Sequence, residues 1–422
     1  MKRIGVIADD FTGATDIASF MVQNGLSVIQ VNGVPKQFDA PDAQVIVVSL
    51  KSRSCPVPQA IEQALAALAW LRQQGCDRFY FKYCSTFDST AEGNIGPVTD
   101  ALLDALGETQ TVISPALPVN GRTVYQGYLF VGDQLLAESG MRHHPVTPMT
   151  DSSLVRLMER QARGRAAVVN TAVMDAGPAA VRDSLDALAA QGISYAVLDA
   201  TCEQHLVTQG EALKAMTLVT GGSGLAIGIA RAWASEPQQG ADAQRAGWPQ
   251  GERAVVLSGS CSQMTNRQVE AYRQIAPARS VEVARCLDDA DGYARALCDW
   301  VEEASASADL APLLYATADA RELQAIQQQH GAARSSEAVE QLFAAVARTL
   351  HARGWQRFIV AGGETSGVVA QALGVTAFHI GPAISPGVPW VRDIRQPLSL
   401  ALKSGNFGDE AFFARAQTEF PL

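Results

Sequence analysis

The chain has 422 residues, of which 47% are hydrophobic and 18% are charged, and its formal net charge is −10 at pH 7. These values are typical of a globular chain long enough for two or three domains, and they exclude a disordered chain. The negative charge disfavours nucleic acid and anionic membranes as main partners, because both attract positively charged surfaces.

Cysteine usage and the N-terminal residues predict a cytoplasmic protein. The seven cysteines are scattered without a CxxC pair, which is typical of reduced thiols rather than of disulfides or a zinc site. The first apolar run, 4–8, is too short for the core of a signal peptide. No apolar run approaches the roughly 18 residues that a membrane span needs. We therefore expect a soluble protein without a membrane partner.

The first predicted strand, 4–8, ends in two adjacent aspartates, Asp9 and Asp10. Ligands of open α/β sheets bind at the carboxyl ends of the strands. Adjacent carboxylates at such an end need a cation, a substrate hydroxyl or helix N–H groups nearby. We interpret one aspartate, with Asp10 favoured, as the acceptor of a substrate hydroxyl proton and the other as a positioning group. The alternative is that one caps the following helix while the other faces solvent.

Cations follow two of the next predicted strands. Arg53 comes shortly after the strand 45–50, and Lys82 lies near the end of the strand 78–83. Arg122, in a loop rich in proline, is a third candidate cation. Such side chains suit a substrate that carries a carboxylate, and the planar guanidinium of arginine suits it best. The alternative is that they are ordinary surface cations at the starts of loops.

A glycine-rich stretch, 218–228, reads as strand, Gly-Gly-Ser-Gly and helix. Its glycines miss the G-x-G-x-x-G spacing of a dinucleotide-binding turn. The stretch 235–252 is then rich in Gln, Gly, Ala and Pro, which indicates a linker. We predict one domain over 1–236, a linker over 237–252 and a second domain over 253–422.

The second half contains two units in which a predicted strand leads into a Gly/Ser loop and a helix. The strand 254–257 precedes Ser258-Gly-Ser-Cys-Ser, and the strand 358–360 precedes the turn 362–367 and a helix over 368–373. Glycines in such turns let backbone N–H groups approach a phosphate, and the helix N-terminus adds a positive dipole end. The turn 403–408 is also glycine-rich and could close over a base or phosphate. Ordinary turns with Ser/Thr caps are the alternative.

The chain resembles the four-carbon acid sugar kinase family over nearly its whole length. The resemblance is carried by motifs that occur in one order: IADDFTGATD, KSRS, KYCSTFDST with GNIG, PVNGRTVYQG, TGGSG, LSGSCS, AGGETSG and LKSGNFG. The stretch HPVTPMTDSSLVR is most similar to the 3-oxo-tetronate kinase branch of this family.

This resemblance implies two α/β domains with largely parallel sheets and a ligand crevice between them. The first would bind a sugar acid and the second ATP, whose γ-phosphate would pass to the C4 hydroxyl of 3-oxo-tetronate. By position, the implied ATP contacts are Ser258, Val360, Ala361, Gly362, Gly363 and Gly405. The implied substrate region holds Asp9, Asp10, Arg53, Lys82, Asp88 and Arg122. We expect Mg²⁺ to bridge the phosphates, as in other phosphoryl transfers.

Other functions stay open at this point. A D-threonate or D-erythronate 4-kinase would share most of these motifs. An NAD(P)-dependent oxidoreductase acting on a hydroxy acid would need a regular fingerprint at 221–228 and an acidic ribose partner, and the sequence has neither. A sugar-acid sensor without catalysis is a further alternative. The sequence leaves open the ligands of Mg²⁺ and any assembly into a homo-oligomer.

Overall fold

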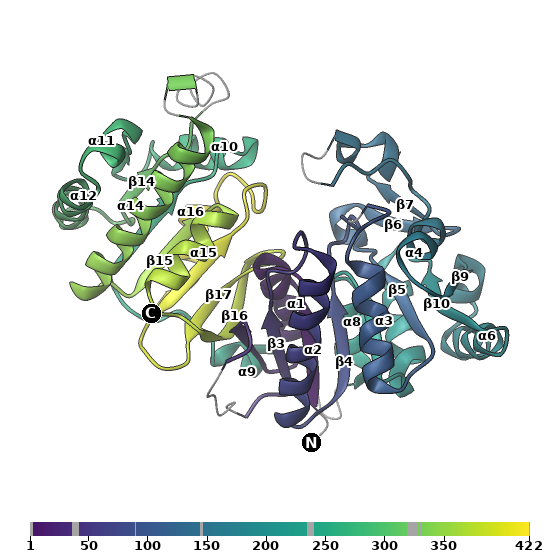
Figure 1. Ribbon diagram of the computed structural model, residues 1–422. Coiled ribbons are helices and arrows are strands. Elements are labelled where there is room, and N and C mark those ends of the chain that lie inside the picture. Colours follow the sequence, from purple (N-terminus) through teal and green to yellow (C-terminus); the bar gives the residue numbers. More distant parts are fainter. Residues whose placement is uncertain are drawn as a thin grey trace. The chain divides into compact units, whose positions relative to one another are not determined.

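The computed structural model describes residues 3–35, 42–88, 90–143, 147–233, 240–318, 328–329 and 331–421. The chain divides into two compact units, Met1–Ala243 and Gln244–Leu422. Each unit is built from a mostly parallel sheet and helices (Figure 1), so the predicted α/β class is confirmed. The division falls within the predicted linker, which also contains the short helix α9, Gly240–Arg245.

The first unit is organised on a parallel sheet with the strand order β2, β3, β1, β4, β11, β5, β10 and β9. These strands span Arg3–Ala8 (β1), Val28–Asn32 (β2), Val45–Ser49 (β3), Cys76–Lys82 (β4), Thr111–Ser114 (β5), Arg165–Val169 (β9), Ile193–Leu198 (β10) and Leu218–Gly221 (β11). Every residue of β3 is buried, as expected of a parallel strand covered on both faces.

Helices cover this sheet. They span Phe11–Gln23 (α1), Val57–Gln73 (α2), Ile95–Leu106 (α3), Leu154–Gln161 (α4), Thr171–Asp175 (α5), Pro178–Ala190 (α6), Glu203–Ala212 (α7) and Leu225–Trp233 (α8). α2 packs beside α3, and α1 packs beside α8. α1 is buried at every residue from Gly13 to Val22, so it is an internal helix rather than an amphipathic surface helix.

A small antiparallel sheet was not predicted. It consists of β6 (Arg122–Tyr125), β7 (Tyr128–Val131) and β8 (Gln134–Leu135). The prediction that Arg122 lies in a loop is therefore wrong, because this residue begins β6. Gln126 and Gly127 form the first hairpin turn, with φ angles of 53° and 73°. Positive φ at both positions matches the right-handed twist of the strands, but Gln-Gly is a weaker hairpin signal than Asn-Gly.

The second unit has the strand order β13, β14, β12, β15, β18, β17 and β16, with β17 antiparallel to both of its neighbours. The strands span Ala254–Ser258 (β12), Ala278–Ser280 (β13), Leu313–Tyr315 (β14), Arg357–Ala361 (β15), Ala377–Ser385 (β16), Val388–Asp393 (β17) and Ser399–Lys403 (β18). The helices span Gln263–Tyr272 (α10), Val283–Asp288 (α11), Ala290–Ser305 (α12), Ala332–Ala352 (α14), Gly363–Ala372 (α15) and Phe412–Thr418 (α16).

One core of the second unit lies between its sheet and the helices α10 and α16. Val256, Ile359 and Trp390 of the sheet belong to it, together with Tyr272 of α10 and Phe413 of α16. This core fixes β12 and β15 side by side, and their carboxyl ends therefore meet at one edge of the sheet. Among the described residues, none of the helices is both long and apolar enough to cross a membrane.

Candidate functional site

The first cluster of predicted site residues lies at the carboxyl ends of β1, β3 and β4. Ala8, the last residue of β1, pairs with Ser49 of β3 and with Lys82 of β4. The backbone beyond the strands is also joined: Asp9 N–H donates to the Lys82 carbonyl at 3.0 Å. The N–H groups of Ser52 and Arg53 both donate to the Asp9 carbonyl. The fold therefore brings together side chains that lie up to 73 residues apart in the chain.

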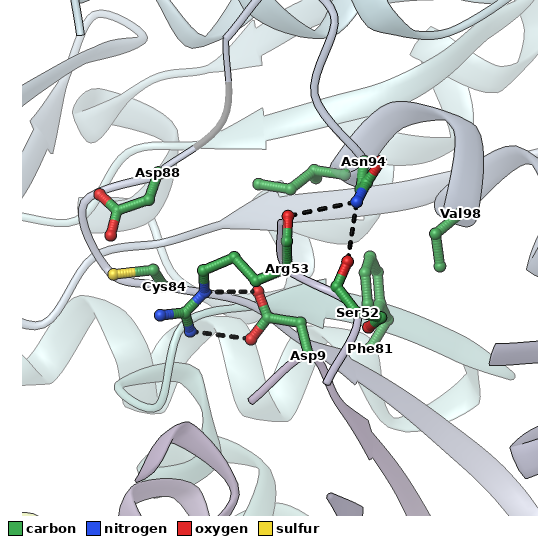
Figure 2. A pocket seen from close by; sticks show the side chains of 9 residues that line it. Asp9, Ser52, Arg53, Phe81, Cys84, Asp88, Asn94 and Val98 are labelled. Carbon is green, nitrogen blue, oxygen red and sulfur yellow. Dashed lines mark hydrogen bonds and ion pairs between the residues drawn. The ribbon is translucent and has the colours of Figure 1, made fainter. Parts of the chain in front are cut away.

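Asp9 and Arg53 form a two-point ion pair. Figure 2 shows the guanidinium facing the carboxylate, with Nε and Nη2 each 2.9 Å from an Asp9 oxygen. Burial alone would lower the pKa of Arg53, but Asp9 and Asp10 raise this pKa well above its ordinary value. The arginine therefore stays charged in a site that is largely shielded from water. Because Asp9 uses both oxygens on Arg53, it is suited to positioning.

Asp10 has a different environment. It caps α1, with Oδ1 accepting from Gly13 N–H at 2.8 Å, and the same oxygen lies 2.8 Å from Arg53 Nη2. The Asp10 side chain is 29% exposed, against 7% for Asp9. Burial raises the pKa of Asp10 most, and the charge of Asp9 raises it further, against the lowering by Arg53, Lys82 and the helix N–H. Asp10 thus has a raised pKa and is the more accessible carboxylate of the two.

Gly13 is required by this arrangement. A Cβ at residue 13 would collide with Asp10 Oδ1 and come within 3.0 Å of Lys82 Nζ. The missing side chain therefore allows the carboxylate and the ammonium to meet over the first turn of α1. Lys82 itself is buried and donates to the Tyr83 carbonyl at 2.7 Å.

The other two predicted substrate residues are placed differently. Asp88 lines one pocket with Asp9 and Arg53 (Figure 2), and its carboxylate accepts from the Thr86 hydroxyl. Arg122 does not line that pocket, and its guanidinium donates to the Asn120 carbonyl. The structure therefore brings Asp9, Asp10, Arg53 and Lys82 together and sets Asp88 beside them, with Arg122 outside the pocket lining. Lys82 and Asp10 do not line this pocket either, but Asp10 contacts the lining residue Arg53.

The sequence analysis missed two polar residues of this region. Asn94 donates from Nδ2 to the carbonyls of Ser52, Arg53 and Cys55 at 2.7, 3.2 and 2.9 Å. It thereby holds the loop that presents Arg53, and the GNIG motif was its only sequence signal. Asp16 is buried in α1 and bonds to the Ser223 hydroxyl. Burial raises its pKa against the opposing charge of Lys82, and no periodicity of α1 could indicate this.

The glycine-rich stretch of β11 and α8 has a packing explanation. Side chains at Gly221, Gly222 and Gly224 would collide with the carbonyls of Ser114, Pro115 and Ala116. Gly228 lies against the backbone of α7, where Leu206 and Gly210 approach it. Close backbone contact therefore explains the glycines without a bound dinucleotide.

The second cluster lies in the second unit, where β15 leads into α15. The sequence analysis predicted a turn over 362–367 and a helix from 368, and this boundary is wrong, because α15 begins at Gly363. Gly362 makes the whole turn alone, with a φ of 126° that disfavours residues with side chains. As N-cap it offers no side-chain hydrogen bond to α15. The first N–H groups of a helix have no partner within it, so α15 presents donors at this end.

These donors border a pocket of about 250 Å³. Its lining comes from the segments that follow β12, β14 and β15 and from α11, α14 and α15: Gly259, Ser260, Cys261, Val283, Ala316, Ser335, Ser336, Val339, Glu340, Gly362, Gly363, Glu364 and Thr365. A Cβ added to Gly363 would meet nothing within 4 Å, so a ligand can approach this backbone closely. An uncapped helix N-terminus beside an open glycine is a suitable phosphate site.

The predicted ATP contacts divide into two groups. Gly362 and Gly363 line the pocket, whereas Ser258, Val360 and Ala361 are fully buried strand residues that do not. The Ser258 hydroxyl is bonded to Thr317 at 2.7 Å. Gly405 lies against Ser260, whose hydroxyl would be 2.8 Å from an added Cβ. The nucleotide contacts themselves stay predictions.

The polar lining residues of α14 were missed. This helix contributes Ser335, Ser336 and Glu340, whereas Ser260 and Thr365 lie beside the predicted glycines. No motif in the sequence marked the three residues of α14. Glu340 and Glu364 are oxygen donors of the kind that Mg²⁺ takes alongside phosphate oxygens and water. Among the described residues, no group of three or more His, Cys, Asp or Glu could hold a metal alone.

Comparisons with known proteins cover the whole chain. Residues 4–229 match a family described as a sugar-binding N-terminal domain, and residues 255–413 match a nucleotide-binding C-terminal domain. A 3-oxo-tetronate kinase of Pectobacterium atrosepticum is 66% identical, covering 100% of both chains. One of Salmonella typhimurium is 63% identical, also covering 100% of both. A crystal structure from Salmonella typhimurium LT2, provisionally described as a tRNA synthase, has a TM-score of 0.95 at 62% identity over 100% of both chains.

Proposed function

Because the chain belongs to the four-carbon acid sugar kinase family, we propose that it is an ATP-dependent kinase that converts 3-oxo-tetronate to 3-oxo-tetronate 4-phosphate. The observation that carries this proposal is the similarity to curated 3-oxo-tetronate kinases along the full length of both chains. The geometry supports it, because one unit gathers Asp9, Asp10 and Arg53 at adjacent strand ends and the other offers a helix N-terminus suited to phosphate.

Phosphoryl transfer passes through a loose transition state, so catalysis consists mainly of positioning and charge neutralisation. Arg53, held by Asp9, binds the carboxylate of the sugar acid through its planar guanidinium. Asp10 accepts the proton of the C4 hydroxyl as this oxygen attacks the γ-phosphorus of ATP. The bond from the γ-phosphorus to the β,γ-bridging oxygen breaks, and ADP leaves. The raised pKa of Asp10 suits a proton acceptor better than that of an ordinary surface aspartate.

In the second unit, N–H groups at the start of α15 bind the phosphates of ATP. Ser260 and Thr365 supply hydroxyl donors at the same pocket wall. Mg²⁺, with Glu340 and Glu364 as the carboxylates nearest at hand, would neutralise charge on the phosphates. The side chains of Ser258, Val360 and Ala361 form the buried support of this wall.

A kinase assay with ATP, Mg²⁺ and a panel of four-carbon acids tests this function. We expect 3-oxo-tetronate to give the highest kcat/KM, and phosphorus NMR of the product to show a phosphate ester at C4. D-threonate and D-erythronate serve as the matched alternatives, since they differ from it at C3 or in stereochemistry. Preference for either would assign the chain to that substrate, and no ATP turnover with any of them would contradict a kinase.

Two alternative functions are less well supported. The glycines at 221–228 are explained by backbone packing, which removes the main reason to expect NAD(P). The tRNA-synthase description of one solved relative is not carried over, because a net charge of −10 disfavours a polyanionic substrate.

A further inference from the structure

The pocket beside α15 has an unusual charge for a phosphate site. Of the described residues that line it, none is Lys or Arg, while Glu340 and Glu364 are carboxylates. Backbone N–H groups must therefore provide most of the phosphate binding. Their contribution depends on how rigidly the protein holds two glycine turns, one at Gly362 and one at Gly405.

Lys403, the last residue of β18, contacts both of them. Its carbonyl accepts from Gly362 N–H at 2.8 Å, at the start of α15. Its fully buried Nζ donates to the carbonyls of Ser404 and Gly405 at 3.0 and 2.8 Å, and to Thr265 Oγ1 at 3.0 Å. One residue thus joins the turn at Gly362 to the turn at Gly405.

The same turn is fastened from α10. Thr265 Oγ1 donates to the Gly405 carbonyl at 2.7 Å, and Gln268 Nε2 donates to the carbonyls of Phe407 and Asp409. Thr265 and Gln268 are three residues apart and therefore lie on one face of the helix. The free side of Gly405 packs against Ser260, which lines the pocket. The turn that Lys403 holds therefore lies next to a residue of the pocket wall.

We propose that Lys403 is a positioning residue of the nucleotide site, whose side-chain Nζ fastens the Gly405 turn to Thr265 and so fixes the backbone that binds ATP. This inference rests on the proposed kinase function. Lys403 does not line the pocket, so its contribution reaches ATP through Gly405 and Ser260. Its three hydrogen-bond partners are neutral oxygens of Thr265 and of the turn, and its Nζ also lies 6.0 Å from the centre of the Phe412 ring.

Arg357 provides a matched control for the loss of a buried cation. It begins β15, next to β18 in the same sheet but at the opposite end from Lys403. Its Nη2 donates to the Phe420 carbonyl at 3.2 Å, and its guanidinium lies 4.9 Å from the centre of the Trp390 ring. Replacing Arg357 therefore removes a buried cation of this sheet without touching either glycine turn.

Steady-state kinetics of Lys403→Met and Arg357→Met separate positioning from general support. We expect Lys403→Met to raise the KM for ATP about tenfold or more, the size of one lost charged hydrogen bond, and to change the KM for the sugar acid less than about twofold. Arg357→Met should leave both KM values near those of the unchanged enzyme, even if it lowers the melting temperature. ATP titration by calorimetry should show the same difference without any turnover.

A second pair of variants, at Thr265, tests the same inference if Lys403→Met does not fold. Thr265→Val removes the hydroxyl that bridges Nζ and the Gly405 carbonyl and that also accepts from the Ser262 hydroxyl, and Thr265→Ser retains it. We expect Thr265→Val to raise the KM for ATP and Thr265→Ser to keep the KM of the unchanged enzyme. Unchanged ATP affinity in both Lys403→Met and Thr265→Val, or an equal loss in Arg357→Met, would overturn the inference while leaving the kinase function intact. An unchanged enzyme that neither binds nor consumes ATP would overturn the function and this inference with it.

Discussion

Asp9 and Asp10 are adjacent in the chain, yet the structure gives them different partners. Asp9 is buried and binds Arg53 with both oxygens, whereas Asp10 caps α1 and remains partly exposed. The sequence could place two carboxylates at the end of a strand, but not assign their roles. That assignment depends on Arg53 and Gly13, which meet them only in the folded chain.

Replacing Asp10 by Asn should reduce kcat by about 10²-fold or more, because it removes the proposed proton acceptor. The raised pKa of Asp10 also places the acid limb of kcat at a higher pH than an ordinary aspartate would give. Activity should fall as Asp10 becomes protonated, and this limb should be missing from the residual activity of Asp10→Asn. Pre-steady-state or steady-state rates across pH measure both effects. Asp9→Asn is the control, since it should mainly raise the KM for the sugar acid. Near-normal turnover in Asp10→Asn would show that Asp10 is not the proton acceptor.

The buried side chain of Lys403 should make the stability of the protein depend on pH. Burial lowers its pKa to about 7, whereas the unfolded chain keeps a lysine pKa of about 10.4. Between these values the unfolded chain binds more protons, so the free energy of unfolding should rise with pH. The expected slope is at most about 1.4 kcal/mol per pH unit, measured by urea unfolding between about pH 7 and 8.5. Lys403→Met should lack this component, and equal slopes in the two proteins would contradict it.

Among the elements, α15 was predicted from the sequence as a helix, but its first residue was not predicted correctly. The apolar strand β15 and the glycines after it were evident, and the structure confirms a strand followed by a helix there. The helix start was misplaced because Gly362 alone makes the turn, which a pair of adjacent glycines does not reveal. The antiparallel sheet from β6 to β8 was missed because Gln126-Gly127 is a weak turn signal. Contacts between segments that are distant in the chain leave no periodic pattern in the sequence. The hydrogen bond from Asn94 to the loop of Arg53 is one example.

Replacing Gly362 and Gly367 of this region by alanine should have opposite effects on the free energy of unfolding. Gly362 has a φ of 126°, and an added Cβ would lie 2.9 Å from Thr365 Oγ1. Gly362→Ala should therefore lower the free energy of unfolding by about 1–3 kcal/mol and weaken ATP binding. Gly367 lies inside α15 with open space around its Cβ position. Gly367→Ala should raise stability by roughly 0.5–1 kcal/mol. Chemical denaturation and ATP titration measure both, and an equal effect of the two changes would contradict this account of the turn.

At the scale of the whole molecule, ATP should stabilise the folded chain by mass action. An ATP concentration about 100 times the dissociation constant adds about 2.7 kcal/mol to the free energy of unfolding. A thermal-shift experiment with Mg²⁺ should therefore show a rise in melting temperature with ATP. NAD at the same concentration is the control and should give none, because the glycines at 221–228 serve packing. A larger shift with NAD than with ATP would favour an oxidoreductase.

The resemblance to a kinase family predicted separate roles for the two units, and the proposed chemistry rests on the two strand-end clusters. The most direct test is a crystal structure of the protein with a non-hydrolysable ATP analogue, Mg²⁺ and a four-carbon acid. The account predicts phosphates on the N–H groups of Gly363 and its neighbours, and the acid's carboxylate on Arg53. Phosphates bound away from the start of α15, or an acid that does not contact Arg53, would contradict it.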